Sequence, residues 1–359
     1  MHVVVVGSGV IGMTCSYLLD YHGCQVTVID SETSYAQKAS FQNGGLLCPS
    51  QSDSWTYWKN ITWNKISSIG FGQDTIEHSR WFVSWLRNCN RDTSGSLREL
   101  SNLSMQLFSQ PPFNSISSSS YQRVAKGTYD VEKQQLYPED SNGDIRGFCK
   151  EMYLQLEPRV RFRFNTRVKS ICVCDNNITG LQVTGPNLEK EIIKGDYYLF
   201  ATGISTTQIL STIGIYCPIL PALGYLVSFT IPHTTQPSIN VKYKDYYVSH
   251  FPTFLRASAF CDITRNPNIS RFKTLSQYIK RDYPNHTITS ARHGIRPLSP
   301  DDAPYIGKVK PYNNLFVCSG HGSKGWTLAT GSAMLLKEQL FGNTLSIRSK
   351  PFDPNRFET

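Results

Sequence analysis

Paired cysteine motifs, blocks of one charge and long apolar runs are all missing from this sequence. Its ten cysteines include no C-x-x-C pair, which argues against a zinc ribbon and against a disulfide-dense secreted scaffold. We therefore expect reduced, mostly buried thiols and no metal site. No run of Lys and Arg exceeds two residues, so a basic tail is excluded. The longest apolar stretch, residues 219–231, is interrupted by Pro221 and Gly224 and is too short to span a bilayer.

A leader segment is not expected either. Met1 and His2 run directly into residues 3–6 and a glycine loop, which leaves no room for a charged region followed by a cleavable apolar segment. The sequence therefore predicts a cytoplasmic protein, with peripheral contact at a membrane as the alternative that its charge allows.

The composition predicts a folded chain of one elaborated domain or two. Of the 359 residues, 40% are apolar and 18% are charged, which provides enough apolar material for a core. The net charge is +9, and residues 241–296 hold ten basic and three acidic residues. Such a region could steer an anionic substrate or meet an anionic membrane, although a solvated basic face is the commoner outcome. Nucleic-acid binding has no motif to support it.

The first 30 residues form a complete βαβ pattern. Residues 2–6 are apolar and β-branched, which predicts a strand buried on both faces, and residues 26–29 predict a second one. The apolar residues of 10–22 have helical spacing. The string Gly7-Ser8-Gly9-Val10-Ile11-Gly12 joins the first strand to this helix, and Asp30 ends the second strand. In this context G-x-G-x-x-G is a dinucleotide-binding fingerprint.

Each residue of the fingerprint has a physical task. Gly7 permits the tight turn, Gly9 lets the backbone approach a pyrophosphate, and Gly12 permits close packing of helix on strand. The helix N-terminus offers free N–H groups and a positive dipole end to the phosphates. Asp30 is placed to accept hydrogen bonds from ribose hydroxyls. FAD and NAD both use this fingerprint.

The rest of the chain alternates between further segments of βαβ type and aromatic-rich α+β insertions. One of these insertions, residues 51–110, holds five of the six tryptophans. Helices are expected near 76–88, 96–109, 143–156, 270–283 and 326–341, and strands at 121–131, 161–164, 168–173, 181–183, 190–193, 197–201, within 219–260 and at 315–318. This alternation predicts two discontinuous domains. The nucleotide-binding domain would contain 1–50, 139–215 and 290–345, the substrate domain 51–138 and 216–289, and residues 346–359 would form a C-terminal tail.

Further motifs are spread along the whole chain. Residues 40–45 read S-x-x-N-x-G, residues 294–307 read G-x-R-P-x-x-P-D-x-x-P-x-x-G, and residues 320–327 read G-H-G-x-x-G-W-T, which is the most specific of the three. Together with the fingerprint, they resemble the FAD-dependent D-amino-acid dehydrogenase/oxidase family, most closely its bacterial D-amino-acid dehydrogenase branch.

The resemblance implies FAD as the cofactor. It also implies an α/β fold, with a Rossmann-like FAD-binding domain and a discontinuous antiparallel-sheet α+β substrate domain. The cofactor-binding residues that it implies are Gly7, Ser8, Gly9, Val10, Ile11, Gly12, Asp30, Asn43, Gly44, Gly45, Val168, Ala201, Thr202, Gly203, Gly320, His321, Gly322, Gly325, Trp326 and Thr327. We do not interpret His321 as a general base.

The resemblance also implies a site for a small amino-acid substrate. Arg296 matches the family's carboxylate-binding arginine, and a guanidinium fork suits a carboxylate. Tyr225 and Tyr247 are candidates for the other walls of this pocket, although tyrosines in apolar strands are often simply packed in the core.

The implied activity is FAD-dependent oxidation of a D-amino acid in amino-acid catabolism, by hydride transfer from Cα to the flavin. The product is an imino acid, which hydrolyses to a 2-oxo acid and ammonia. The residues do not choose between quinone and oxygen as the electron acceptor. Two alternatives stay open. One is a secondary-amine oxidase of the glycine or sarcosine type. The other is a catalytically silent FAD-binding scaffold, which the short segment between Tyr129 and Pro138 would favour, because the family carries additional strands and helices there.

Overall fold

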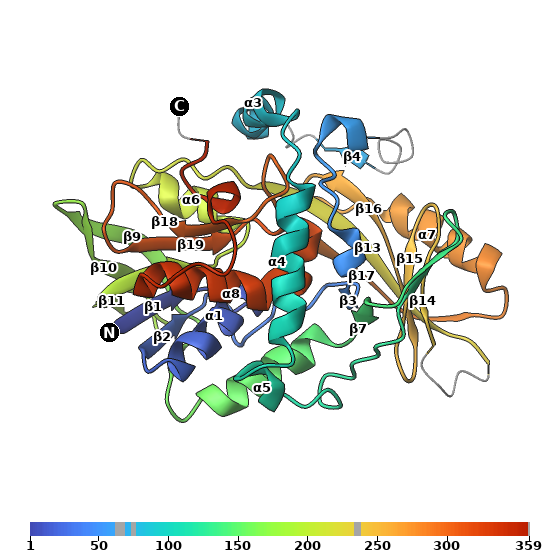
Figure 1. Cartoon of the computed structure of the whole chain (residues 1–359), viewed down its shortest axis with the longest axis horizontal. Helices are drawn as coiled ribbons and strands as arrows, with labels where there is room; N and C mark the ends of the chain where they lie inside the picture. The colour runs from blue at the N-terminus through green and yellow to red at the C-terminus, as the bar shows by residue number, and fades with distance from the viewer. Residues whose placement is uncertain (62–68, 73–76, 233–237, 358–359) are drawn as a thin grey trace.

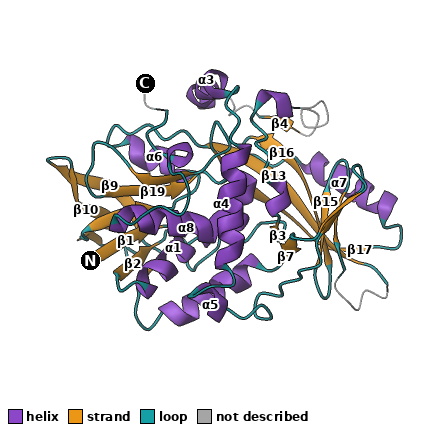
Figure 2. Cartoon of the chain, in the orientation of Figure 1, coloured by secondary structure: helices purple, strands orange, loops and turns teal. Residues whose placement is uncertain are grey.

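The chain builds two main sheets that lie at opposite ends of the molecule (Figure 1). The computed structural model describes residues 1–61, 69–72, 77–232 and 238–357. Helices fill the space between the sheets and cover one face of the first sheet, as the colouring of Figure 2 shows. The fold is a mixed α/β arrangement with a Rossmann-like domain, as the sequence predicted.

The first sheet has six strands, and β1 lies inside it. In spatial order the strands are β18 (Tyr305–Lys308), β19 (Leu315–Ser319), β12 (Tyr197–Phe200), β1 (His2–Val6), β2 (Gln25–Ile29) and β8 (Arg161–Arg163). All neighbours are parallel except β18 and β19. Because parallel strands are covered on both faces, each face of β1 must be apolar, and its valines meet this requirement.

The alternation of side chains along β1 divides the core into two layers. Val3 and Val5 pack against a helical layer, and Val4 and Val6 pack against the opposite layer. The helical layer consists of α1 (Val10–Tyr21), α4 (Ser94–Leu107), α5 (Ile145–Leu156) and α8 (Gly325–Phe341). The opposite layer consists of α6 (Ser205–Ser211) and an antiparallel sheet of β9 (Arg167–Cys174), β10 (Asn177–Thr184) and β11 (Lys190–Ile193).

The second sheet is mainly antiparallel. Its strands in spatial order are β17 (Thr287–Leu298), β13 (Leu220–Thr230), β16 (Leu255–Ile263), β15 (Tyr247–His250), β14 (Asn240–Lys242), β5 (Thr128–Asp130) and β6 (Gln135–Tyr137), with β4 (Ile69–Phe71) beside β16. Two pairs, β14 with β5 and β16 with β4, are parallel. Helix α7 (Ile269–Asp282) covers one face of this sheet, where Leu275 and Ile279 join the strand side chains in a separate core.

The remaining elements are short. They are α3 (Ser79–Asn88), the strand pair β3 (Leu46–Leu47) and β7 (Ser141–Asn142), and the 3-10 turns η1 (Pro49–Gln51), η2 (Trp58–Asn60), η4 (Phe113–Ser115), η5 (Gly322–Lys324) and η6 (Lys350–Phe352). Among the described residues, no helix is long and apolar enough to cross a membrane. All ten cysteines are unpaired, and six of them are buried.

Three segments differ from their predicted positions. Strand β17 pairs with β13 along its whole length, so residues 290–298 belong to the second sheet instead of the nucleotide-binding part. The sequence places α4 in the substrate part, but Leu97 and Leu100 are buried in the core of the first sheet, against α8. Of the strand expected at residues 121–131, only β5 forms; Gly127, at φ +86°, immediately precedes it.

The C-terminal segment, predicted to be a tail, is packed onto the first domain. Phe352 and Phe357 are buried, and the Arg356 guanidinium lies over the Phe357 ring and contacts the turn at Asp301. Arg356 Nε and Nη2 each donate to an Asp301 carboxylate oxygen at 2.9 Å, and both side chains are shielded from water. The buried ion pair therefore attaches the end of the chain to the loop that follows β17.

Removing this arginine should be costly. Arg356→Ala leaves the buried Asp301 carboxylate short of its bidentate partner, so we expect a loss of about 3–5 kcal/mol in the free energy of unfolding. Denaturant unfolding followed by circular dichroism measures this loss. Arg348→Ala, which removes an exposed arginine from the same segment, is the control and should change stability by less than about 0.5 kcal/mol. Equal effects of the two substitutions would contradict the structural role of the pair.

Candidate active site

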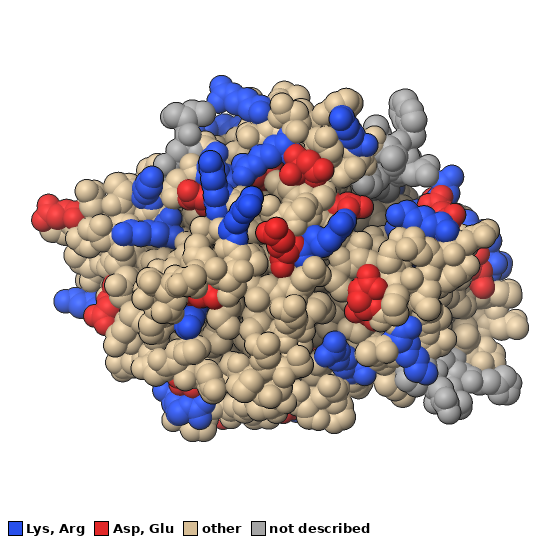
Figure 3. Space-filling model, in the orientation of Figure 1, with Lys and Arg blue, Asp and Glu red and all other residues tan. Residues whose placement is uncertain are grey.

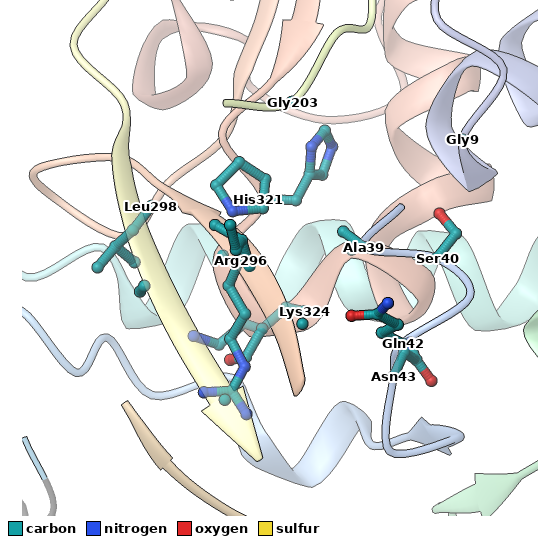
Figure 4. A pocket seen from close by; sticks show the side chains of 18 of the residues that line it. Gly9, Ala39, Ser40, Gln42, Asn43, Gly203, Arg296, Leu298, His321 and Lys324 are labelled. Atoms are coloured by element: carbon teal, nitrogen blue, oxygen red, sulfur yellow. The ribbon is translucent and has the colours of Figure 1, made fainter. Parts of the chain in front are cut away.

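A cavity of about 1200 Å³ runs from the carboxyl ends of the parallel strands to the inner face of the second sheet. Figure 4 shows Gly9 and Ser40 on one side of it, Arg296 and Leu298 on the other, and His321 between them. The volume exceeds the usual range for a single drug-sized ligand, about 300–1,000 Å³. The cavity therefore has room for a dinucleotide and a small substrate together.

The glycine loop forms the first wall of the cavity. Gly7 has φ +103°, and a Cβ atom there would lie 2.5 Å from the carbonyl oxygen of Ala201 at the end of β12. A Cβ atom on Gly12 would collide with the Gly7 carbonyl oxygen. These contacts give Gly7 the turning role and Gly12 the packing role that the sequence predicted. Gly9 lines the cavity itself, with Val10 and Ile11.

Asp30 lies at the end of β2, beside the glycine loop. The backbone N–H and the hydroxyl of Ser8 both donate to Asp30 Oδ2 at 2.6 Å, and the Glu32 N–H donates to Oδ1 at 3.0 Å. The carboxylate is thus fixed in orientation while it still lines the cavity. Ser8 is buried and serves the site through Asp30.

Two polar groups in this half of the cavity were absent from the predicted set. The Val10 N–H, in the first turn of α1, donates to Ser40 Oγ at 2.9 Å. Glu32 forms an ion pair with Lys38 at 2.9 Å, and the hydrogen bond from Lys38 lowers the pKa of this carboxyl. Ser40 was visible in the S-x-x-N-x-G string, whereas Glu32 follows Asp30 in a polar loop with no motif of its own.

The loop between β19 and α8 forms the floor of the cavity. Gly320, His321, Gly322, Gly325 and Thr327 line it, as do Ala201, Thr202 and Gly203 from the end of β12, Val168, Asn43 and Gly44. His321 is buried, and its Nε2 lies 3.0 Å from Ser332 Oγ. Burial lowers the pKa of His321 to about 3, so the ring is neutral at pH 7.

Arg296 reaches the cavity from β17. It faces Ala222 across the strand pair, and its guanidinium lies over Gly224, where any Cβ atom would overlap with it. Arg296 Nη1 donates to the Phe260 carbonyl oxygen at 2.8 Å. This backbone contact orients the guanidinium, which also has the Cys261 thiol beside it and lines the cavity.

A second cation, Lys324, lines the same end of the cavity and was also absent from the predicted set. Its ammonium donates to Asp302 Oδ2, and both side chains are nearly excluded from water. The Trp55 N–H donates to the same Asp302 oxygen at 3.2 Å. Burial raises the pKa of Asp302, which the Lys324 ammonium opposes. In Figure 4, Lys324 and Arg296 lie on the same side, below His321.

The two predicted tyrosines have different positions. Tyr247 lines the cavity, donates to Gln51 Oε1 at 2.9 Å, and has a pKa raised by burial. Tyr225 was expected in the same pocket, but it points to the opposite face of β13 and is buried against α7. Its hydroxyl donates to Asp262 Oδ2 at 2.9 Å and accepts from the Asn268 N–H at 2.8 Å. The physical reason is the two-residue period of β13, which turns Ala222, Gly224 and Leu226 to the cavity.

Two other predicted residues support the site mainly by packing. Gly45 has φ +81° and lies against Phe251, so it shapes the turn after Asn43. Trp326 touches the cavity but is almost fully buried, with its ring 6.2 Å from that of Tyr121. Across the described part of the chain, no group of three His, Cys, Asp or Glu side chains could hold a metal ion.

Comparison with known proteins gives a family match over almost the whole chain. The model of the DAO family, described as FAD dependent oxidoreductase, matches residues 2–339.

Solved structures with a similar fold include three amino-acid or amine enzymes. Iminodiacetate oxidase from Chelativorans sp. BNC1 has a TM-score of 0.70 at 16% identity, covering 98% of this chain and 98% of its own. L-proline dehydrogenase from P. horikoshii has a TM-score of 0.75 at 17% identity, covering 99% and 97%. Glycine oxidase from Bacillus cereus has a TM-score of 0.70 at 18% identity, covering 97% and 99%. At these identities, the likeness shows a shared fold.

The residues of the cavity fit FAD, the cofactor of the matched family. Gly9 presents bare backbone at the N-terminus of α1, and a Cβ atom there would lie 3.3 Å from Ser40 Oγ, in the space where a diphosphate approaches. Asp30 lies beside this position for the ribose, and Val168 lines the same half. The Gly320–Thr327 loop, at the start of α8, borders the other half.

The diphosphate assignment predicts the effect of a larger residue at position 9. Gly9 has φ −66°, so Gly9→Val does not strain the backbone, and its side chain would occupy the approach to α1. We expect correctly folded but colourless protein, with FAD content at least about tenfold lower by absorbance of the released cofactor. Gly95→Val, at an open position in α4, is the matched control and should keep its FAD. Stoichiometric FAD in Gly9→Val would contradict the assignment.

The neutral state of His321 predicts a dependence of stability on acid. Its pKa is about 3 in the folded protein and about 6.5 when exposed, so only the unfolded chain takes up this proton between those values. The free energy of unfolding should therefore fall as the pH is lowered through this window, by up to about 1.4 kcal/mol per pH unit from this group. His321→Gln should reduce that slope in denaturant titrations made with excess FAD. Parallel slopes for both proteins would contradict the neutral, buried imidazole.

Proposed function

Because the chain belongs to the DAO family of FAD-dependent oxidoreductases, we propose that it oxidises an amino acid whose carboxylate binds Arg296. FAD supplies the acceptor for the two electrons of the substrate C–H bond. The observation that carries the proposal is that the fingerprint loop and Arg296 line one continuous cavity.

The surroundings of Arg296 support carboxylate binding. Its guanidinium is part-buried and donates to a neutral carbonyl, that of Phe260, with the neutral Cys261 thiol as a further neighbour. A partly desolvated guanidinium binds a carboxylate through two parallel hydrogen bonds, which also fix the direction of the bound molecule. Lys324 adds an ammonium to the same end of the cavity, with its charge balanced by Asp302.

Two other groups of the cavity, His321 and Tyr247, carry no negative charge that would hold a substrate ammonium. His321 stays neutral because burial lowers its pKa, and Tyr247 stays protonated because burial raises its pKa. Arg296 adds a positive charge, which disfavours a substrate ammonium nearby. Oxidation of the Cα–H bond then needs alignment of a neutral amine more than an acid–base residue. The product imino acid would hydrolyse to a 2-oxo acid and ammonia.

We propose a D-amino acid with an apolar side chain as the first substrate to test. The motifs at residues 294–307 and 320–327 resemble those of D-amino-acid dehydrogenases. Apolar side chains near Arg296 support an apolar substrate: Leu298 follows it on β17, and Trp55 and Ile69 lie in the same small core as Leu298.

A secondary amino acid is the second candidate. The chain and the glycine oxidase, proline dehydrogenase and iminodiacetate oxidase structures cover each other almost completely. Although the turn between β5 and β6 is short, this chain is therefore comparable in length to enzymes with those names. This comparison supports a catalytic protein over a silent scaffold.

Truncation of Arg296 tests the proposed role. Arg296→Ala removes a charge-assisted bidentate contact and should raise the apparent KM for a D-amino acid by about a hundredfold. Arg296→Lys should recover little of this affinity, because an ammonium cannot reproduce the fork. FAD content should stay near that of the wild type. Steady-state kinetics on FAD-replete protein, with dye as electron acceptor, provide the measurement.

The control uses the same strand and a second substrate form. Arg292→Ala removes an exposed arginine of β17, which contacts the Phe41 ring, and should leave the KM unchanged. The wild type should strongly prefer an amino acid over its amide, and Arg296→Ala should lose that preference. Equal oxidation of acid and amide by the wild type would assign Arg296 another role.

A further inference from the structure

Four large apolar side chains are exposed on one side of the molecule, over α3 and its neighbours. Their exposed fractions are 54% for Trp58, 68% for Phe71, 46% for Val83 and 63% for Leu86. They come from η2, β4 and α3, which lie together at the top of Figure 1. We call these four residues, with the basic side chains Lys59, Arg80 and Arg87, the α3 surface.

The outward position of Val83 and Leu86 follows from how α3 is anchored. The indole N–H of Trp81 donates to the Leu298 carbonyl oxygen at 2.8 Å, and that of Trp85 donates to the Thr56 carbonyl oxygen at 3.0 Å. These bonds turn one face of α3 toward the second sheet. Helical spacing then turns Val83 and Leu86 to the opposite side. Tryptophan anchors therefore hold the apolar residues in place on the surface.

The charges beside these residues are mostly basic. Residues 57–61, 69–72 and 77–88 carry three exposed cations, Lys59, Arg80 and Arg87, and one exposed acid, Glu77. Lys59 lies 5.6 Å from the ring of Trp58, and Arg87 follows Leu86 on the helix. In Figure 3, basic side chains lie along the upper edge, over α3. Apolar residues flanked by cations are typical of segments that enter the interface of an anionic bilayer.

We propose that the α3 surface docks the enzyme on an anionic lipid bilayer. Helix α3 lies at the upper edge of the molecule in Figure 1, and its outer side presents two apolar side chains, Val83 and Leu86, that are 46% and 63% exposed. Such a surface suits the headgroup region of a membrane, into which Trp, Phe and Leu insert while Lys and Arg meet lipid phosphates. The chain needs no membrane-spanning helix for this mode of binding.

The location of this surface connects it to the active site. Lys59, Asn60 and Ile69, from the same segments, line the cavity, as does Trp55 shortly before η2. A bilayer bound at the α3 surface would therefore lie beside the cavity, as a lipid-soluble quinone acceptor requires; this consequence rests on the proposed function.

Vesicle co-sedimentation of the FAD-loaded enzyme tests the docking without turnover. We expect binding to vesicles of phosphatidylcholine mixed with phosphatidylglycerol to be at least about tenfold stronger than to phosphatidylcholine alone, and to weaken as salt is raised. The Val83→Glu, Leu86→Glu double variant should lose about tenfold or more of this affinity. Arg87→Glu alone should lose about fivefold or more. FAD content and dye-coupled turnover in solution should not change, since none of these residues lines the cavity.

The control is Leu188→Glu, which places one glutamate, as each substitution of the double variant does, at a leucine that is 79% exposed outside the α3 surface. It should bind vesicles as the wild type does. The proposal is overturned if the wild type binds neither vesicle type, if both types bind equally, or if Leu188→Glu and the α3 variants bind alike. Gel filtration provides a second test: a wild-type dimer that the double variant dissociates would make the surface an interface between two copies of this chain.

Discussion

The close approach of Gly7 to the end of β12 is the contact on which the rest of the site depends. The Gly7 N–H donates to the Ile29 carbonyl oxygen at 2.8 Å, while its missing side chain leaves room for the Ala201 carbonyl. The turn out of β1 is therefore fixed against both neighbouring strands. It directs the N-terminus of α1, the Asp30 carboxylate and the Ala201–Gly203 segment toward one space. Any side chain at Gly7 would have to separate β1 from β12, and the cofactor wall would be lost with the sheet contact.

The second sheet completes the cavity in a similar way, because a missing side chain again makes room for another group. Gly224 on β13 leaves space for the Arg296 guanidinium from β17, and the Phe260 carbonyl orients it. One face of β13 thus holds the small residues Ala222 and Gly224 beside the Arg296 guanidinium, and its other face holds large side chains packed on α7. One face of β13 therefore contributes to ligand binding, and the other contributes to the core under α7. The neutral His321 and the balanced Lys324–Asp302 pair keep the floor of the cavity polar, with its charges compensated.

The sequence predicts the first sheet well because its requirements are local. Residues 3–6 are all apolar, which fits a strand that is covered on both faces. The glycine fingerprint requires a strand before it and a helix after it. The sequence could not predict the orientation of β13 in the same way. Leu223, Tyr225 and Leu226 are all apolar enough for either face. The sequence therefore did not show which alternate residues of β13 face the cavity, and Tyr225 was assigned to the wrong side. Lys324 was not predicted as a site residue, because a lysine in a glycine-rich turn is usually exposed on the surface. Its burial depends on Asp302, 22 positions away, and only the folded chain brings the two together.

The central claim is that this chain passes electrons from an amino acid to its own FAD. Anaerobic titration of the purified FAD-loaded protein tests it directly, because no outside acceptor is needed and only the bound cofactor can change colour. A panel of D-amino acids and secondary amino acids should include at least one member that bleaches the visible absorption of the bound FAD completely, at a rate that rises to a plateau with its concentration. If none of them changes the spectrum while dithionite bleaches the same sample, the chain binds FAD without oxidising amino acids, and the proposed activity is wrong.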